Sequence, residues 1–180
     1  MKGGTVNMQK GLSDTIETGN PALQGITPHT GSLDAANLSF GIVASRFNTE
    51  LTEGLLASTV TGLKEHGAQA ERITVVRVPG AYEIPTALEV MATQGACHAL
   101  IALGAIILGE TPHADAISTQ VNRALSDISQ RHHIPVIDGV VAAPTMELAV
   151  ARCLSGTESR GAYAAKAAIE MAHVILSLKD

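Results

Sequence analysis

Five consecutive residues, Gly109-Glu110-Thr111-Pro112-His113, carry the clearest signal for chemistry in this sequence. They follow a strongly apolar run, and they are typical of the start of a helix, with Thr111 as N-cap and Pro112 as the first helical residue. The free backbone N–H groups and the dipole at such a start favour an anion, most often a phosphate. The alternative is a well-capped helix that binds no ligand.

His113 falls in the first turn of this expected helix. The positive end of the helix dipole disfavours a protonated imidazole, and a neutral imidazole can accept a proton, as a general base must. His113 is therefore a candidate proton acceptor, and a solvated surface histidine is the alternative. We expect His132 and His133, at the far end of the same helix, to be solvated surface.

A second segment, Pro79-Gly80-Ala81-Tyr82-Glu83-Ile84-Pro85, is predicted to turn from a strand into a helix. Its prolines restrict the backbone, and Gly80 allows a ligand to approach closely. The Glu83 carboxylate can accept hydrogen bonds from ring or hydroxyl donors of a ligand. An acidic residue is also favoured in the first turn of a helix whatever its function.

The third segment, Arg46-Phe47-Asn48, follows the first expected strand. Phe47 lies beyond the strand end, so its ring can either stack on a planar heterocycle or pack beneath a loop. Two further arginines, Arg152 and Arg160, are possible phosphate partners because a guanidinium matches phosphate geometry, with solvated surface as the alternative.

Composition excludes several classes of protein. The chain has 180 residues, of which 46% are hydrophobic and 16% are charged. Its net charge is −5, whereas a non-specific nucleic-acid binder would be basic, so that class is excluded.

Cys97 and Cys153 form no CxxC pair and are expected to be buried small hydrophobes. The sequence contains no GxGxxG, Walker or GxSxG motif and no dense metal-ligand cluster. With neither a secretory signal nor a membrane span apparent, we expect a cytoplasmic protein.

Apolar strands alternate with helical patterns from Phe40 onward, which predicts βαβ units and a parallel sheet covered by helices on both faces. The expected fold is a three-layer α/β/α sandwich with four parallel strands, forming one domain over residues 38–180. Residues 1–37 are expected to be a flexible tail or an arm. The expected strands are Phe40–Ala44, Ile73–Val78, Ala99–Ile107 and Pro135–Val141. Because ligands bind beyond the carboxyl ends of such strands, the three segments above should share one site.

Together, Arg46-Phe47-Asn48, the PGAYEIP run from Pro79 to Pro85 and the LGAIILGETPH run from Leu103 to His113 resemble the lumazine synthase (6,7-dimethyl-8-ribityllumazine synthase) family. The resemblance extends from about Phe40 to Leu178. It implies a flavodoxin-like sandwich and a transferase of riboflavin biosynthesis. Such an enzyme condenses 5-amino-6-(D-ribitylamino)uracil with L-3,4-dihydroxy-2-butanone 4-phosphate and releases phosphate, without metal or organic cofactor.

The resemblance also implies roles for individual residues. Phe47 would stack on the pyrimidine, His113 would accept the proton, and Glu110 and Thr111 would hold the phosphate, largely through backbone N–H groups. The ring and ribityl pocket would be lined by Ala81, Tyr82, Glu83, Ala105, Ile106 and Ile107. Three residues would enter from a neighbouring subunit: Asp138, Arg152 on the phosphate, and Arg160.

Three residues depart from the family pattern. Leu108 stands in place of a usual Arg, Asp138 in place of a common Phe after the fourth strand, and Arg160 in place of a common Lys. Leu108 and Asp138 favour an alternative in which the chain is a catalytically impaired paralogue that binds lumazine or flavin, or forms a shell. A flavodoxin-like FMN carrier is disfavoured, since Arg-Phe-Asn replaces the Ser/Thr/Gly-rich phosphate loop.

A site shared between subunits implies a pentamer as the minimum unit, and some members of the family assemble twelve pentamers into a hollow, 60-subunit icosahedral shell. The short turn from Leu154 to Gly161 is compatible with the shell. The resemblance also suggests riboflavin synthase as a partner. No nucleic acid or membrane partner is expected.

Overall fold

Four apolar segments form the parallel strands of one sheet, in the order β2-β1-β3-β4. The computed structural model describes residues 21–108 and 112–179. The strands are β1 (Phe40–Ser45), β2 (Ile73–Val78), β3 (Ala99–Ile107) and β4 (Val136–Ala143). All four predicted strands are confirmed, although β4 continues two residues past the predicted end.

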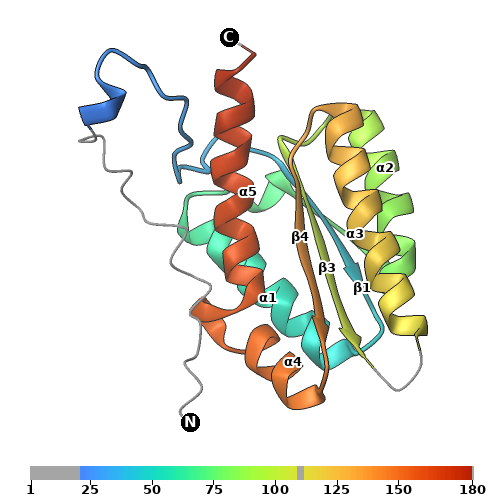
Figure 1. The fold of residues 1–180 in the computed structure, drawn as a ribbon. Coiled ribbons are helices and arrows are strands. Elements are labelled where there is room, and N and C mark those ends of the chain that lie inside the picture. Colours follow the sequence, from blue (N-terminus) through green and yellow to red (C-terminus); the bar gives the residue numbers. More distant parts are fainter. Residues whose placement is uncertain (1–20, 109–111, 180) are drawn as a thin grey trace.

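Two layers of helices enclose the sheet, and this confirms the predicted three-layer α/β/α sandwich (Figure 1). One face is covered by α1, α4 and α5, and the other by α2 and α3. The helices are α1 (Thr49–Glu65), α2 (Ile84–Gln94), α3 (His113–His132), α4 (Met146–Cys153) and α5 (Arg160–Ser177).

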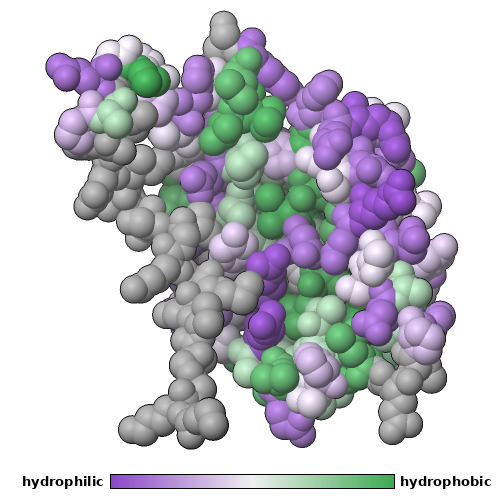
Figure 2. Space-filling model, viewed as in Figure 1, coloured by the Kyte–Doolittle hydropathy of each residue, from purple (hydrophilic) through white to green (hydrophobic). Residues whose placement is uncertain are grey.

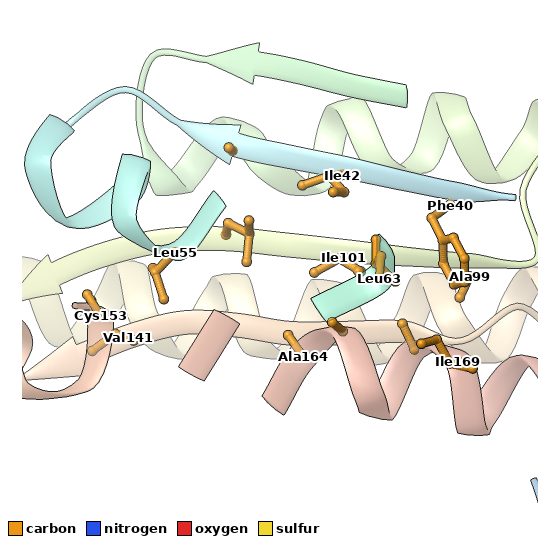
Figure 3. Close-up of a cluster of buried hydrophobic side chains, with 14 of the residues drawn as sticks. Phe40, Ile42, Leu55, Leu63, Ala99, Ile101, Val141, Cys153, Ala164 and Ile169 are labelled. Carbon is orange, nitrogen blue, oxygen red and sulfur yellow. The ribbon is translucent and has the colours of Figure 1, made fainter. Parts of the chain in front are cut away.

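The central strands are buried because helices cover both of their faces. Every residue of β1 and the first eight of β3 are buried, as expected for a parallel sheet. Figure 3 shows the core on the α1–α4–α5 face, where Ile42 and Ile101 of the sheet lie opposite side chains such as Leu55 and Ile169. With little aromatic volume available, Ala, Leu, Ile and Val fill this space.

Close contact between α1 and α5 depends on small residues. A Cβ atom on Gly161 would lie 2.4 Å from the carbonyl oxygen of Leu55, so only glycine fits there. The Thr59 hydroxyl is fully buried and donates to the carbonyl oxygens of Leu55 at 2.8 Å and Gly161 at 3.0 Å. The helices therefore contact each other almost backbone to backbone.

One prediction for α3 is wrong. His132 is not solvated surface, because its Nε2 lies 2.9 Å from Oε1 of Glu89 on α2, and Arg131 donates to the other carboxylate oxygen at 2.8 Å. The hydrogen bond with His132 is the main cause that lowers the pKa of Glu89. The outer helices are thereby joined near the end of α3.

The two cysteines are unpaired thiols. Cys153 is fully buried and burial raises its pKa to about 11, while Cys97 is half-buried and burial also raises its pKa. No helix within the described ranges is both long and apolar enough to cross a membrane.

Candidate functional site

Strand pairing brings the first two sequence motifs together. β1 and β2 run in parallel and in register, with Ser45 opposite Val78. Beyond that pair, Arg46 N donates to the carbonyl oxygen of Val78 at 2.8 Å, and Phe47 N donates to that of Pro79 at 3.0 Å. The loop after β1 and the PGAYEIP turn therefore leave the sheet side by side at its carboxyl edge.

Asn48 connects the same loop to β3. Its backbone is left-handed, with φ 56° and ψ 53°, a conformation that Asn tolerates better than most residues. Its side-chain Nδ2 donates to the carbonyl oxygen of Ala105 at 2.9 Å. Asn48 was not predicted as a site residue, although an Asn between a strand and a helix is a known signal for such a turn.

These connections form a cleft of about 850 Å³ at the carboxyl ends of β1, β2 and β3 and the start of α3. Its walls contain all eight site residues that were predicted from this subunit and lie within the described ranges. They are Phe47, Ala81, Tyr82, Glu83, Ala105, Ile106, Ile107 and His113. The structure thus gathers three motifs that are far apart in the sequence into one concave surface.

Two exposed aromatic rings stand at this cleft. Phe47 is 71% exposed and Tyr82 is 63% exposed, the two largest exposed fractions among the large hydrophobic side chains of the described residues. In the described structure, Phe47 is therefore not packed beneath a loop, the alternative raised by its sequence position. Both rings are free to contact a planar ligand.

Glu83 has a structural contact as well as a place in the cleft. It ends a short 3₁₀ helix, Ala81–Glu83, and its Oε2 accepts a hydrogen bond from Gly80 N at 2.8 Å. This bond closes the turn that precedes α2. Tyr82 is held next to the cleft by the same turn.

His113 is the first residue of α3 and its side chain is exposed. Pro112 is the N-cap, one residue later than the predicted cap Thr111. Ala116, Ile117 and Gln120 also line the cleft, and they were not predicted to do so. Their spacing of three, four and seven residues from His113 places them on one helix face, a signal that the sequence already contained.

Two predicted phosphate-binding residues, Glu110 and Thr111, lie outside the described residues. Leu108, the residue before them in the described structure, is half-buried and packs against the core on the α2–α3 face. Its backbone N–H continues the sheet by donating to the carbonyl oxygen of Ala143 at 2.9 Å.

The three residues predicted to serve a neighbouring subunit do not line this cleft. Arg152 is exposed in the last turn of α4, and Arg160 is the first residue of α5. Asp138 lies within β4, opposite Ala102, as the expected strand Pro135–Val141 placed it. The description of the family pattern, which put this position after the fourth strand, is corrected.

Asp138 and Arg160, both departures from the family pattern, contact each other. Arg160 Nη2 donates to the carbonyl oxygen of Asp138 at 2.6 Å and lies 3.6 Å from its carboxylate. Arg160 is thus not simply a solvated surface residue.

A comparison with known protein families agrees with this geometry. Residues 37–175, most of the chain, match the model of the family described as 6,7-dimethyl-8-ribityllumazine synthase. The matched range contains the strands and helices that build the cleft.

Proposed function

Because this chain belongs to the 6,7-dimethyl-8-ribityllumazine synthase family, we propose that it is the transferase of riboflavin biosynthesis that forms the lumazine ring. The substrates are 5-amino-6-(D-ribitylamino)uracil and L-3,4-dihydroxy-2-butanone 4-phosphate. The observation that carries the proposal is the single cleft that collects Phe47, Tyr82, Glu83 and His113 at the carboxyl edge of the sheet.

The cleft suits a planar ring that carries a polar chain. Ala105, Ile106 and Ile107 make part of its lining apolar, and the exposed Phe47 ring is available to stack on a pyrimidine. One carboxylate oxygen of Glu83, Oε2, accepts the hydrogen bond from Gly80 N. The other oxygen, Oε1, can accept a hydrogen bond from a ribityl hydroxyl of the ligand.

The proposed reaction needs little beyond orientation and proton transfer. The pyrimidine amine adds to the ketone carbonyl and loses water to give a Schiff base. Phosphate is then eliminated, and ring closure by the second amine releases a second water. A protein group must accept a proton during these steps, and His113 is the histidine at the cleft. Holding both substrates together supplies much of the remaining acceleration.

We propose that each cleft is completed by a second copy of the chain. Arg152, on the phosphate, together with Arg160 and Asp138 would come from the neighbour, since all three lie away from the cleft of their own subunit. Exposed apolar side chains on α4, namely Met146, Leu148 and Val150, give the neighbour an apolar contact. Figure 2 shows further hydrophobic surface between α5 and α3, where β4 runs.

The assembly we propose is a pentamer, and pentamers can associate further into a 60-subunit shell in the cytoplasm, with riboflavin synthase as a partner. Native mass measurement tests the first step. Pentamers or multiples of five are expected. A stable monomer with full turnover would contradict the shared site.

A turnover assay with both substrates tests the reaction itself. The lumazine product is followed by its absorbance, and released phosphate is measured in parallel. Equal amounts of lumazine and phosphate are expected. The alternative is a paralogue that binds lumazine or flavin without turnover. It is favoured by Leu108, which packs on the core and places no cation beside the phosphate turn. Tight binding of 6,7-dimethyl-8-ribityllumazine with no product formed would support that alternative.

A further inference from the structure

The Arg160 guanidinium is held by contacts on two sides. Its Nη2 donates to the main-chain oxygen of Asp138 at 2.6 Å and lies 3.6 Å from Asp138 Oδ2. Its central carbon lies over the Tyr163 ring, 4.9 Å from the ring centroid. A long side chain that would otherwise sample many rotamers is thereby restricted to one region.

Asp138 is itself fixed by the strand that carries it. Its Oδ1 accepts a hydrogen bond from Val140 N at 2.9 Å. β4 lies at one edge of the sheet, and the carbonyl oxygens of Pro135 and Ala143 accept hydrogen bonds from the side of the neighbouring strand, β3. Backbone N–H and C=O groups alternate in direction along a strand, so the carbonyl oxygen of Asp138 and the N–H of Val140 point toward the open edge. The Asp138 side chain and Arg160 satisfy these two edge groups.

The result is a cation at a defined place on the open edge of the sheet. The Arg160 and Asp138 side chains are 36% and 40% exposed, so both can be reached from outside. Within the described part of the chain, the hydrogen bond to the Asp138 carbonyl uses one guanidinium nitrogen of Arg160. Two nitrogens of the fork remain to donate to a ligand oxygen.

We propose that Asp138 is a positioning residue that holds Arg160 at the β4 edge, ready to donate to an oxygen of the ligand bound in a neighbouring copy's cleft. The inference rests on the proposed function, because Arg160 meets a ligand only when a second copy places its cleft there. Asp138 acts through Arg160, since its two carboxylate oxygens face Val140 N and the guanidinium. Fixing the cation in advance lowers the entropy lost on binding.

A double-mutant cycle on the assembled protein tests this inference. Asp138→Asn keeps the side-chain shape and an acceptor for Val140 N but removes the charge that faces Arg160. An exposed ion pair of this kind contributes up to about 1 kcal/mol. The substrate whose KM rises in Arg160→Ala is the one that Arg160 contacts, and in Asp138→Asn the KM of that substrate should rise about two- to fivefold, with kcat nearly unchanged. In an Arg160→Ala background, Asp138→Asn should change KM no further.

The control is Glu53→Gln, which removes the charge from another exposed ion pair, with Arg77, away from this edge. It should leave both KM values as they are. If Asp138→Asn does not assemble, Asp138→Ser takes its place in the cycle, because it also removes the charge that faces Arg160 and keeps a side-chain oxygen as acceptor for Val140 N. It should raise the same KM. Equal losses from Asp138→Asn with and without Arg160 would overturn the inference, because Asp138 would then act independently of it.

Failure of the proposed function gives a different result. A wild-type protein that binds 6,7-dimethyl-8-ribityllumazine but forms none contradicts the proposed reaction alone, and the same cycle is then measured on the Kd of that ligand. Coupling between positions 138 and 160 supports the positioning role, and independent effects overturn it. A wild-type protein that neither binds nor forms lumazine overturns both.

Discussion

The side-chain amide of Asn48 donates a 2.9 Å hydrogen bond to the carbonyl oxygen of Ala105, and this bond joins the loop after β1 to the end of β3. The loop also carries Phe47, whose ring stands exposed at the cleft. One hydrogen bond thus joins the loop that carries the proposed stacking residue to the end of β3, which also lines the cleft.

Two substitutions at Asn48 should separate its two contributions to stability. Asn48→Gly keeps the left-handed backbone but loses the hydrogen bond, so unfolding free energy should fall by about 1 kcal/mol. Asn48→Ala loses the bond and also forces alanine into the left-handed region, which costs a further 1 kcal/mol or so. Urea unfolding followed by circular dichroism measures both. Equal stability of the two variants would show that the backbone conformation relaxes.

His113→Ala should lower kcat by roughly 10–100-fold, because general acid–base catalysis contributes about 10²–10⁴-fold and a facile condensation puts the loss at the low end. Affinity for the ribitylaminouracil should stay nearly unchanged. The matched control is His133→Gly, which removes an exposed imidazole from the other end of α3, where φ is 50° and glycine fits. A His113→Ala enzyme with wild-type kcat would leave His113 as a helix-start residue only.

The strands and helices could be predicted from the sequence because their signals are local. The apolar runs at Phe40–Ser45 and Ala99–Ile107 are long and uninterrupted, and Gly95 ends α2 with φ 66°, a conformation suited to glycine. His132 was placed wrongly because its partner Glu89 lies 43 residues away on another helix. A charged partner on a neighbouring element leaves no trace in local spacing.

The part of the site formed by motifs that directly follow strands could be predicted from the sequence. Phe47 and Glu83 share a cleft because parallel strands end at one edge of the sheet. The pairing of Asp138 with Arg160 was not predictable, since it depends on where α5 begins relative to the edge of β4. Helix placement of that kind follows from packing, and no motif encodes it.

Arg152→Ala should weaken binding of the phosphorylated ketone by about 1.5–3 kcal/mol, because a charge-assisted hydrogen bond to phosphate is lost. Affinity for the pyrimidine should change much less. Calorimetric titration with each substrate measures the two effects separately. Arg123→Ala, which removes another exposed arginine, is the control and should change neither affinity. Equal losses for both substrates would contradict the phosphate assignment.

Two buried hydroxyls should respond in opposite ways to removal. Ser45 Oγ is buried with no hydrogen-bond partner in the described structure, so Ser45→Ala should leave unfolding free energy unchanged or raise it by up to about 1 kcal/mol. Thr59→Val keeps the side-chain shape but loses the bonds that Thr59 donates to Leu55 and Gly161, so about 1–2 kcal/mol should be lost. Urea unfolding compares them. A clear loss in Ser45→Ala would indicate a partner such as a buried water.

Stability should fall on mild acidification because of His98. Its Nδ1 accepts a hydrogen bond from Ser39 N at 2.9 Å, so the folded state needs that nitrogen unprotonated. Burial is the first cause that lowers the His98 pKa below its ordinary value of 6.5, followed by the positive charges of Arg72, His173 and Lys179. The unfolded chain therefore binds a proton before the folded one does.

By linkage, His98 does not change the free energy of unfolding well above pH 6.5, where it is neutral in both states. The free energy of unfolding falls as the pH drops through 6.5, because the unfolded chain then binds the proton first. It levels off below the His98 pKa of the folded state. His98→Gln keeps an acceptor for Ser39 N but cannot titrate, so it should lose less stability on acidification than the wild type. Urea unfolding from pH 7.5 to pH 5 measures both, and the difference between the two curves isolates His98 from the other histidines. Parallel curves would show that His98 titrates alike in the folded and unfolded chains.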